Sequence, residues 1–495
     1  MKFAKNWDSM PRQQIQSLQV NRLKGFLTNQ VIQFSPYYSK LHQDGKFPIE
    51  KIRTLDDLKH LPFTTKADMV PTDENPAKPR DFILQPDPNT VSSKLTFFRK
   101  MDLVKGKLLK GKTFKSQILE EYLPIFFTAT TGRSAGQVPF VYSTYDLLRL
   151  SEAGRRLYEV AGMKSGKDFL LNLFPYAPHL AFWAVYSGSV ASIVPGFHTG
   201  GGKTLGTQRI LRLITTLKPT VIVGVPGYVY HLLRIASESE MDLSSIKTIA
   251  LGAERTTDGH REKFRSFLES GGAKDVTIMS TYGFTEAKMA FIECPDGDKM
   301  GYHLFPDMGI FEIVDPDTGE PVKEGEPGEI VFTSLDARGS FVIRFRTGDF
   351  AHDGILYEPC PACGRTVPRL TSNLTRLTNT KELTLQKIKG TLVNLNELDN
   401  VIHAFPEIIE WQVEISKVNN DPLESDSVTL YISLKEGTDQ DSVTGSIGHE
   451  FTKAFEFTPN SIIIESTDNL LERLGMETEL KEKRIVDIRN QIKGE

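Results

Sequence analysis

The chain has 495 residues, of which 39% are hydrophobic and 25% are charged. These proportions are ordinary for a globular protein, so they exclude wholesale disorder and a collagen-like fibre. Lys plus Arg total 59 against 63 Asp plus Glu, and this balance argues against a nucleic-acid partner. Three cysteines are too few for a disulfide framework, and the first ten residues lack the apolar core of a secretion signal, so we expect a cytoplasmic protein.

The N-terminal part predicts helices over residues 1–60, followed by a Pro-rich surface loop over 70–88. Residues 99–115 then carry seven basic residues and one acid. This basic segment predicts either a solvated helix or hairpin, or a patch that binds phosphate groups of a nucleotide or cofactor.

Residues 168–197 are strongly apolar and imitate a membrane span. Prolines interrupt the run, and its longest uninterrupted part, 180–194, has only 15 residues. A spanning helix needs about 20 residues. We therefore expect a buried core helix and a strand here, and no membrane span.

From residue 120 onward, short apolar runs alternate with helical segments. Such alternation is typical of a layered α/β sheet. The expected strands are 221–225, 248–251 and 276–279, and the expected helices are 207–217 and 228–237. Two further strands, 309–314 and 329–333, flank a turn-rich segment and predict a β-rich section.

Near residue 376 the pattern changes to that of a small α+β domain. The expected strands are 411–415, 428–434 and 461–465, and the expected helices are 396–404, 439–456 and 469–492. The sequence thus predicts an α/β fold. A large layered N-terminal domain with a β-rich subdomain covers residues 1–376, and a small C-terminal domain covers 377–495.

A loop of small residues, TATTGRSAG at 128–136, lies between two apolar stretches. Small residues let backbone N–H groups approach an anion, threonine hydroxyls add donors, and Arg133 adds a positive charge. The segment therefore predicts a phosphate-binding loop, although such loops are also common as plain turns. The expected phosphate ligands are Thr128, Thr130, Thr131, Gly132 and Arg133.

The order of motifs along the chain is more specific than any one of them. TATTGRSAG is followed by Gly252–Ala253–Glu254, STYGFTE at 280–286, RFRTGD at 344–349, QKIKG at 386–390 and TELKEKR at 478–484. This order resembles the AMP-forming acyl-adenylate ligase superfamily. FSPYYSKLHQDG and LPFTTKADM near the start, with CPACGRTVPRL after RTGD, resemble the phenylacetate–CoA ligase branch.

The resemblance implies a ligase that activates a carboxylic acid with ATP and Mg²⁺. It would form an acyl-adenylate, release pyrophosphate and pass the acyl group to coenzyme A, with an aryl or arylacetic acid as the first expectation. It also implies that the small C-terminal domain is mobile and acts as a lid. Two alternatives stay open: transfer to a protein thiol, an amine or a deazaflavin cofactor, and a non-catalytic relative that binds a nucleotide.

The resemblance also implies roles for individual residues. The adenine pocket would be formed by Tyr282 and Gly283 together with Gly252, Ala253 and Glu254. Asp349 would accept hydrogen bonds from the ribose hydroxyls. Thr285 would donate to the α-phosphate, and Glu286 would bind Mg²⁺.

Two lysines complete the implied site. Lys481 matches the catalytic lysine of the C-terminal domain, with Lys483 as its neighbouring alternative. Lys381 stands where the hinge between the domains carries an arginine.

Three cysteines and one histidine have the composition of a closed zinc site. Cys294 precedes His303 by nine residues, and Cys360 and Cys363 form a CxxC. Three thiolates and one imidazole are a common structural zinc set. Free buried thiols and a redox pair are the alternatives.

Aromatic residues near the apolar run are candidates for the acid pocket. Tyr176, His179 and Tyr228 could contact an aromatic or apolar acid, or they could be ordinary core residues. We expect small-molecule partners only, the acid and the nucleotide, and consider a homodimer.

Overall fold

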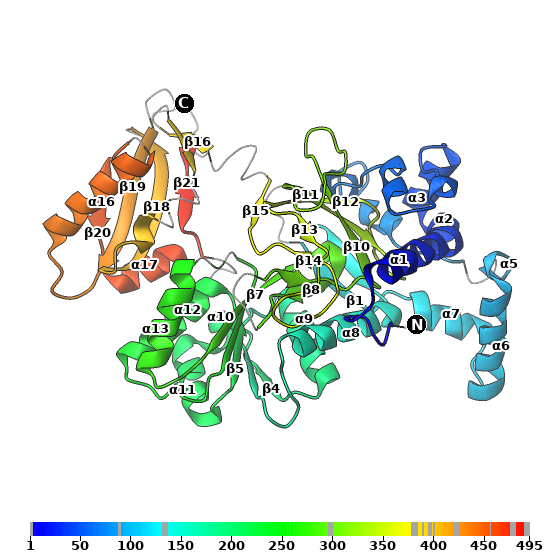
Figure 1. Cartoon of the computed structure of the whole chain (residues 1–495), viewed down its shortest axis with the longest axis horizontal. Helices are drawn as coiled ribbons and strands as arrows, with labels where there is room; N and C mark the ends of the chain where they lie inside the picture. Colours follow the sequence, from blue (N-terminus) through cyan, green and yellow to red (C-terminus); the bar gives the residue numbers. More distant parts are fainter. Residues whose placement is uncertain are drawn as a thin grey trace. The chain divides into compact units, whose positions relative to one another are not determined.

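The computed structural model describes residues 3–87, 91–130, 137–254, 256, 258–295, 300–377, 385–388, 391–394, 398, 401–418, 426–455, 457–475 and 482–489 (Figure 1). These residues divide into two compact units. Unit 1 contains 1–172, 176–198 and 279–375, and unit 2 contains 173–175, 199–278 and 376–495. The expected α/β class is confirmed. The expected domain boundary after residue 376 stays a prediction, since residues 199–278 are grouped here with the C-terminal part.

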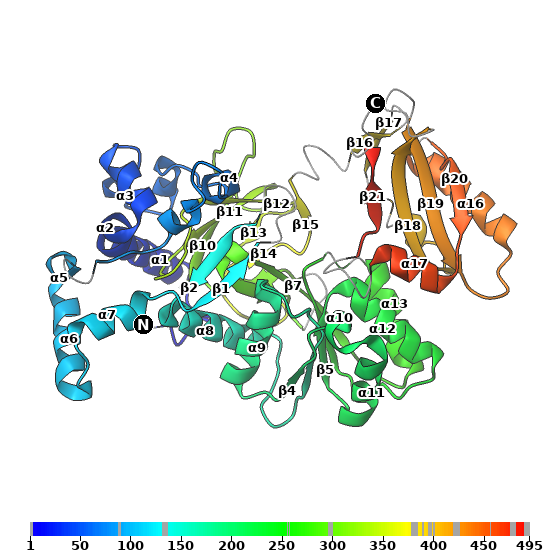
Figure 2. The ribbon, with the colours of Figure 1, turned by 180° about the vertical axis from the view of Figure 1, so that it is seen from behind.

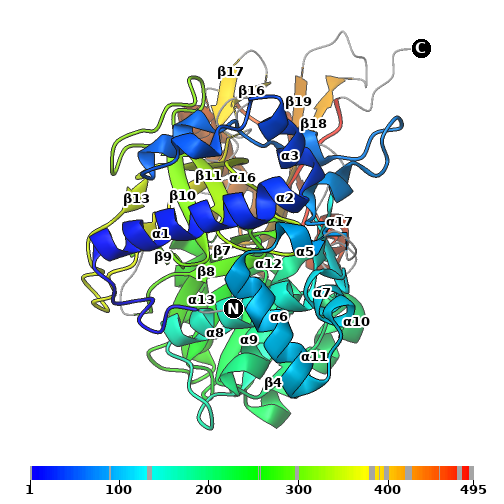
Figure 3. The same cartoon turned by 90° about the vertical axis from the view of Figure 1, so that its right-hand side faces the viewer.

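Unit 1 begins with a helical N-terminal region. Its helices are α1 (Arg12–Phe26), η1 (Leu27–Val31), α2 (Ile32–Phe34), α3 (Pro36–Gln43), η2 (Ile49–Lys51), η3 (Asp56–His60), α4 (Lys66–Met69), η4 (Lys78–Phe82), α5 (Val91–Lys94), α6 (Phe97–Lys110) and α7 (Phe114–Tyr122). Helix α1 crosses the β-rich section of the unit (Figure 3). Gln19 and Arg22 of α1 donate to the carbonyl groups of Gly309 and Asp307.

The middle of unit 1 is a hairpin followed by helices and short strands. It contains β1 (Phe126–Ala129), β2 (Pro139–Tyr142), α8 (Thr144–Val160), β3 (Leu170–Asn172), α9 (Leu180–Ser192) and β4 (Gly196–His198). Strands β1 and β2 are antiparallel, and β3 and β4 are parallel. Helix α8 starts at a capping box, in which Ser143 and Asp146 exchange hydrogen bonds.

Helix α9 is the buried core helix that the sequence predicts on one face only. Tyr186 and Val190 are 44% and 63% exposed, while Leu180 and Phe182 are buried. An apolar run without periodic polar residues does not reveal which of its faces packs, so the exposed face could not be foreseen. In the described part of the chain, no helix is both long enough and apolar enough to cross a bilayer.

The remainder of unit 1 is rich in β-structure. Its elements are η5 (Thr285–Ala287), β8 (Met289–Ile292), β9 (Tyr302–His303), β10 (Gly309–Val314), β11 (Gly328–Ser334), β12 (Phe345–Ala351), β13 (Ile355–Leu356), β14 (Arg369–Leu370) and β15 (Leu374–Arg376). Strand β7 (Thr277–Phe284) forms an antiparallel hairpin with β8. Strands β10, β11 and β12 are antiparallel neighbours, as the turn-rich segment between β10 and β11 predicts.

Unit 2 contains the expected β/α alternation. Its elements before residue 278 are α10 (Gly202–Leu205), α11 (Thr207–Leu217), β5 (Val221–Gly224), α12 (Pro226–Glu238), β6 (Thr248–Leu251) and α13 (Asp258–Ser270). Strand β5 is buried along its whole length and runs parallel to β6. A continuous β-branched run is typical of a strand covered on both faces.

The C-terminal part of unit 2 has its own sheet and core. It contains β16 (Leu385–Ile388), β17 (Thr391–Asn394), β18 (Ile408–Lys417), β19 (Asp426–Leu434), α16 (Gln440–Phe455), β20 (Ser461–Ile464), α17 (Thr467–Leu474) and β21 (Ile485–Asp487). The strand order of its four-stranded sheet is β20-β19-β18-β21.

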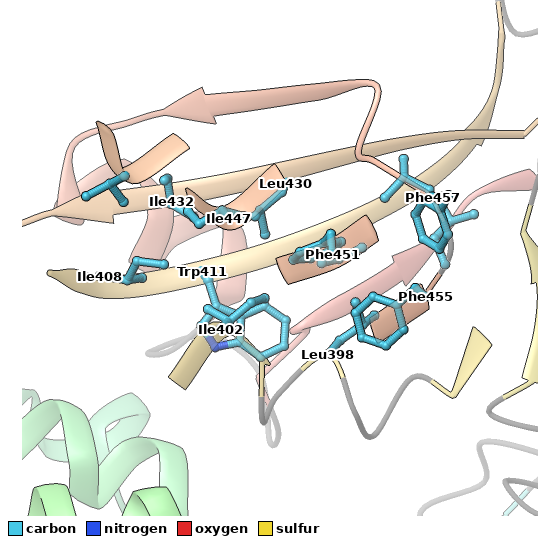
Figure 4. Close-up of a cluster of buried hydrophobic side chains, with 14 residues drawn as sticks. Leu398, Ile402, Ile408, Trp411, Leu430, Ile432, Ile447, Phe451, Phe455 and Phe457 are labelled. Carbon is cyan, nitrogen blue, oxygen red and sulfur yellow. The ribbon is translucent and has the colours of Figure 1, made fainter. Parts of the chain in front are cut away.

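The core of this part follows from sequence periodicity. Trp411, Val413 and Ile415 alternate along β18, and Ile447 and Phe451 recur every fourth residue on α16. All five belong to one buried cluster, in which Trp411, Ile447 and Phe451 lie between the sheet and the helix (Figure 4). The other buried members of the cluster are Leu398, Ile402, Ile408, Val428, Leu430, Ile432, Val443, Phe455 and Phe457.

The expected helix over 469–492 is wrong in its second half. Helix α17 ends at Gly475, which adopts a left-handed conformation with φ 69°, and residues 485–487 form β21, parallel to β18. A glycine C-cap terminates a helix, and the β-branched pair Ile485–Val486 suits a strand. The sequence between Gly475 and Ile485 is rich in charged residues, which are also common in helices, so the pattern did not indicate this boundary.

Candidate active site

The two motifs that would bind the nucleoside meet in unit 1. Tyr282 lies on β7 and donates its hydroxyl hydrogen to Asp349 Oδ2 on β12 at 2.9 Å. The two residues are 67 positions apart in sequence, and both are half-buried. The phenol of Tyr282 and the carboxylate of Asp349 therefore lie side by side and are partly open to solvent.

A bulge in β12 turns Asp349 toward this position. Arg346 pairs with Val331 and Phe350 pairs with Glu329, so residues 347–349 lie opposite Ile330 alone. Gly348 adopts φ 72°, which glycine accepts without a steric penalty. Bulges of this kind re-aim side chains beside active sites, and this one explains why RTGD contains a glycine.

The arginines of the RFRTGD motif hold the sheet together. Arg344 is buried, forms an ion pair with Glu312 at 3.0 Å and donates to the carbonyl of Leu61 at 2.9 Å. Arg346 forms an ion pair with Glu329. Each charge is balanced by a carboxylate, so these arginines fix the strand that carries Asp349.

The described residues of the expected phosphate loop are anchored at the β1–β2 hairpin. Thr128 donates to the hydroxyl of Tyr142 at 3.2 Å, and Thr130 Oγ1 accepts from the N–H of Val138 at 3.0 Å. Both threonines are buried. Thr131, Gly132 and Arg133 lie outside the described residues, so their predicted contacts remain predictions.

Thr285 and Glu286 lie in the connection between β7 and β8. Thr285 is buried and Glu286 is half-buried in the short helix η5. Burial raises the pKa of Tyr142, and the charges of Asp146 and Glu286 raise it further. The charge of Glu286 therefore acts on Tyr142, whose hydroxyl oxygen accepts a hydrogen bond from Thr128. Tyr142 thus links the expected magnesium ligand, Glu286, with strand β1 of the expected phosphate loop.

Tyr142 and its neighbour Lys288 were not foreseen from the sequence. Lys288 donates to the carbonyl of Val141 at 2.6 Å, lies 4.5 Å from the centre of the Tyr142 ring and is 3.4 Å from Asp146. Burial lowers the pKa of Lys288 to about 8. Its position two residues after the YGFTE motif is the one sequence signal that could have drawn attention to it.

Gly252, Ala253 and Glu254 lie in unit 2, directly after strand β6. The N–H of Gly252 donates to the carbonyl of Gly224 at the end of the parallel neighbour β5, at 3.1 Å. Ala253 has φ 71°, which is unusual for a residue with a side chain. In parallel sheets ligands bind beyond the carboxyl ends of the strands, and this segment lies at that edge.

The candidate substrate residues are in different environments. Tyr176 is 65% exposed and packs its ring 5.4 Å from Phe182 and 5.7 Å from Trp183. A ring nitrogen of His179 is 2.8 Å from the carbonyl oxygen of Ala129, which is in the expected phosphate loop. Tyr228 belongs to unit 2, where it is buried and its hydroxyl is 3.3 Å from that of Thr207.

The predicted zinc ligands are brought together in unit 1. One ligand atom from each of Cys294, His303, Cys360 and Cys363 lies within 4.8 Å of every other. The first three residues are at least 98% buried, and Cys363 Sγ is 3.3 Å from His303 Nε2. Three sulfur atoms and one imidazole nitrogen in a buried cluster fit a tetrahedral zinc ion.

The electrostatics of this cluster favour metal-binding protonation states. Burial, together with the charges of Arg365 and Arg369, lowers the pKa of His303 to about 3, so its imidazole is neutral. Burial would raise the pKa of Cys363, but hydrogen bonds from the backbone and side chain of Arg365 lower it below the usual value. Thiolate and neutral imidazole are the forms that bind zinc.

Lys481 and Lys381 lie outside the described residues. Lys483 is described, and its backbone N–H donates to the carbonyl of Leu474 at the end of α17. The roles predicted for all three lysines remain predictions.

Residues 130–336 match the family model of the AMP-binding enzyme. The chain is also 27% identical to a phenylacetate–coenzyme A ligase of Thermus thermophilus, over 84% of this chain and 82% of that protein. It is 24% identical to the phenylacetate–coenzyme A ligase of Escherichia coli, over 97% of this chain and 96% of that one. These matches support the AMP-forming ligase superfamily and its phenylacetate–CoA ligase-like branch, which the order of motifs resembles.

A comparison with solved structures shows the fold of the chain. A 2-hydroxyisobutyryl-CoA ligase in the postadenylation state, bound to 2-HIB-AMP, superimposes with a TM-score of 0.74. It covers 98% of this chain and 92% of the other, at 17% identity. At that identity the likeness concerns the fold, and the substrate of the other ligase is not transferred.

Proposed function

We propose that this protein uses ATP to activate a carboxylic acid as an acyl-adenylate and transfers the acyl group to coenzyme A. The observation that carries the proposal is the hydrogen bond between Tyr282 and Asp349, because it joins the YGFTE and RTGD motifs of the superfamily in one place. An ionised carboxylate that is half open to solvent can accept hydrogen bonds from both hydroxyls of a ribose.

The remaining nucleotide contacts are proposed from the motifs of the superfamily. The Tyr282 ring would stack on adenine. Gly252, Ala253 and Glu254 match the adenine-contacting motif of the superfamily and stay candidates for that role. The β1–β2 hairpin would present Thr128 and Thr130 with the loop that follows them to the phosphates. Glu286 would hold Mg²⁺, which would neutralise phosphate charge when bound.

The reaction would proceed in two displacements. A carboxylate oxygen of the acid attacks the α-phosphorus of ATP, and pyrophosphate leaves with the bonding electron pair. The thiolate sulfur of coenzyme A then attacks the acyl carbon, and AMP leaves. Thr285 would donate to the α-phosphate, and Lys481 would stabilise the negative charge that builds during the first displacement.

The Cys294–His303–Cys360–Cys363 cluster would hold a structural zinc ion. The metal would join the CxxC segment and β9 to the segment that follows β8. The zinc ion would therefore stabilise the fold and take no part in the two displacement steps. All three cysteines of the chain are used in this cluster, which supports the assignment over a redox pair.

An aryl or arylacetic acid is our first candidate for the substrate. The two bacterial relatives named above are phenylacetate–coenzyme A ligases. The exposed ring of Tyr176 packs edge-on against Phe182 and offers an aromatic surface. Three residues later in the chain, His179 contacts the carbonyl oxygen of Ala129 in the expected phosphate loop. A cytoplasmic location and a homodimer stay predictions.

Acid-dependent exchange of labelled pyrophosphate into ATP tests the proposal. The screen covers aryl, arylacetic, fatty and amino acids, and each active acid is then tested for AMP release with coenzyme A. Exchange with an arylacetic acid and AMP release that depends on coenzyme A are expected. Exchange without that dependence would favour another acyl acceptor, and ATP binding without exchange for any acid would favour a non-catalytic relative.

A further inference from the structure

The basic segment 99–115 has no place in the chemistry above. It lies on a helical hairpin of unit 1 made of α6 and α7, which are joined by residues 111–113. Thr96 and Thr113 cap the two helices with their hydroxyls, and Gly111 ends α6 with φ 64°. Helix α7 lies between α6 and α8 in both opposite views (Figures 1 and 2).

One face of α6 is used to hold the helix on α7. Leu103 is 4% exposed, and Arg99 forms an ion pair with Glu121 of α7. The Gln117 side chain of α7 donates to the carbonyl of Leu103 at 2.9 Å and covers Gly106. These contacts fix how α6 is rotated about its own axis, so the direction of its other face is defined.

The other face of α6 is an exposed apolar stripe. Phe97, Met101, Val104 and Leu108 follow one another at intervals of four, three and four residues, which places them in one line. Their exposed fractions are 70%, 42%, 56% and 77%. A helix that is only solvated would carry polar side chains on this face. The prediction of a solvated helix therefore does not account for the exposed apolar stripe.

Lysines border the stripe on both sides. At about 100° per residue, Lys100 and Lys107 lie roughly 70–90° to one side of the stripe and Lys105 roughly 70° to the other. All three side chains are exposed. Five of the fourteen residues of α6 are basic, and its single acid, Asp102, lies farther round the helix.

We infer that α6 binds the surface of an anionic lipid bilayer. An apolar line flanked by lysines is the pattern of a helix that lies in the membrane plane, with its apolar side chains at the boundary of headgroups and acyl chains. The lysines supply attraction to anionic headgroups, which a docking face for a second copy of this chain would not require. The helix would lie on the bilayer and not cross it.

Co-flotation of the full-length protein with vesicles tests this inference. Wild type should bind phosphatidylcholine vesicles containing 30% phosphatidylglycerol at least tenfold more tightly than vesicles of phosphatidylcholine alone. The variant Val104→Gln/Leu108→Gln should lose at least tenfold in affinity for the anionic vesicles. Its matched control, Leu217→Gln/Ile463→Gln, changes two exposed apolar residues of unit 2 and should bind as wild type does.

A charge variant makes the test independent of the apolar substitutions. Lys100→Ser/Lys107→Ser should also weaken binding to anionic vesicles, while Lys247→Ser/Lys274→Ser, which removes two exposed lysines of unit 2, should not. Absence of vesicle binding by wild type, or undiminished binding by both α6 variants, would overturn the inference. A wild-type dimer in sedimentation that dissociates in Val104→Gln/Leu108→Gln, with no vesicle binding, would show that the stripe binds a second copy.

Discussion

Unit 1 holds two polar clusters of opposite character. Tyr282 and Asp349 are half-buried on β7 and β12, strands of two different sheets, where a ligand can still reach them. Cys294, His303 and Cys360 are almost fully buried, and their donor atoms face one another. The first cluster is therefore open to a ligand, whereas the second is enclosed and stabilises the fold of the chain.

The two clusters should therefore respond differently to substitution. Changes in the accessible cluster should reduce activity and lower the free energy of unfolding by no more than about 1 kcal/mol. Changes in buried clusters should reduce the free energy of unfolding. The following predictions test this distinction, from the largest expected effect to the smallest.

Asp146 tests whether burial alone decides the outcome, because it lies in unit 1 beside Tyr142 yet is fully covered. Asp146→Asn should lower the free energy of unfolding by about 3–5 kcal/mol, since it leaves the Lys288 ammonium buried without its carboxylate. Chemical denaturation at pH 7 measures the change. Asp44→Asn, at an exposed aspartate, is the control and should change little.

The same variant has a defined pH signature. Burial would raise the pKa of Asp146, but Lys288 and the backbone N–H groups of Ser143, Gly339 and Arg338 lower it below the usual value. A carboxyl with a lowered folded-state pKa stabilises the protein above its unfolded pKa, about 4, and this stability is lost as the pH falls further. The difference between wild type and Asp146→Asn should shrink below about pH 4; a constant difference would contradict the assignment.

Lys481→Ala should break the first displacement selectively. Loss of a preorganised charge costs on the order of 10²–10³ in rate, so pyrophosphate exchange should fall by that factor. Thioester formation from a supplied acyl-adenylate should fall much less, because the lysine would act on the first step. Lys483→Ala tests the neighbouring alternative and should retain pyrophosphate exchange. Equal loss in both half-reactions of Lys481→Ala would contradict the role.

Cys363→Ser should separate stability from activity at the closed cluster. The purified wild type should carry one zinc per chain, and the variant should lose it. A site with free zinc a hundredfold above its dissociation constant contributes about 2.7 kcal/mol, which sets the expected loss in the free energy of unfolding. His352→Gln, at a histidine outside the cluster, should retain the metal; wild type without stoichiometric zinc would refute the site.

Tyr282→Phe should give the smallest effect. It removes the hydroxyl that donates to Asp349, a net contribution of about 1 kcal/mol, and keeps the ring for stacking. The KM for ATP should rise by less than about tenfold, and the free energy of unfolding should fall by no more than about 1 kcal/mol. Tyr186→Phe, at an exposed tyrosine, should leave the KM unaltered, and a large loss of stability in Tyr282→Phe would place the tyrosine with the closed clusters.

Periodicity and motif order predicted much of this arrangement. The alternating apolar residues of β18 and the β-branched run of β5 predicted these two strands. The three cysteines and one histidine predicted a cluster, and the fold brings these residues together. The bulge that aims Asp349 and the hydrogen bond between Thr128 and Tyr142 could not be predicted, since both depend on the exact register of paired strands. The end of α17 was missed because charged residues follow its glycine cap.

The central claim is that Tyr282 and Asp349 form part of a nucleotide site used for acid activation. Its most direct test is acid-dependent pyrophosphate exchange by wild type and Asp349→Asn at limiting ATP. We predict exchange by wild type and a loss of roughly tenfold to a hundredfold in the variant, because a hydrogen bond to a charged group contributes about 1.5–3 kcal/mol. Wild-type rates in Asp349→Asn, with equal ATP affinity, would contradict the account.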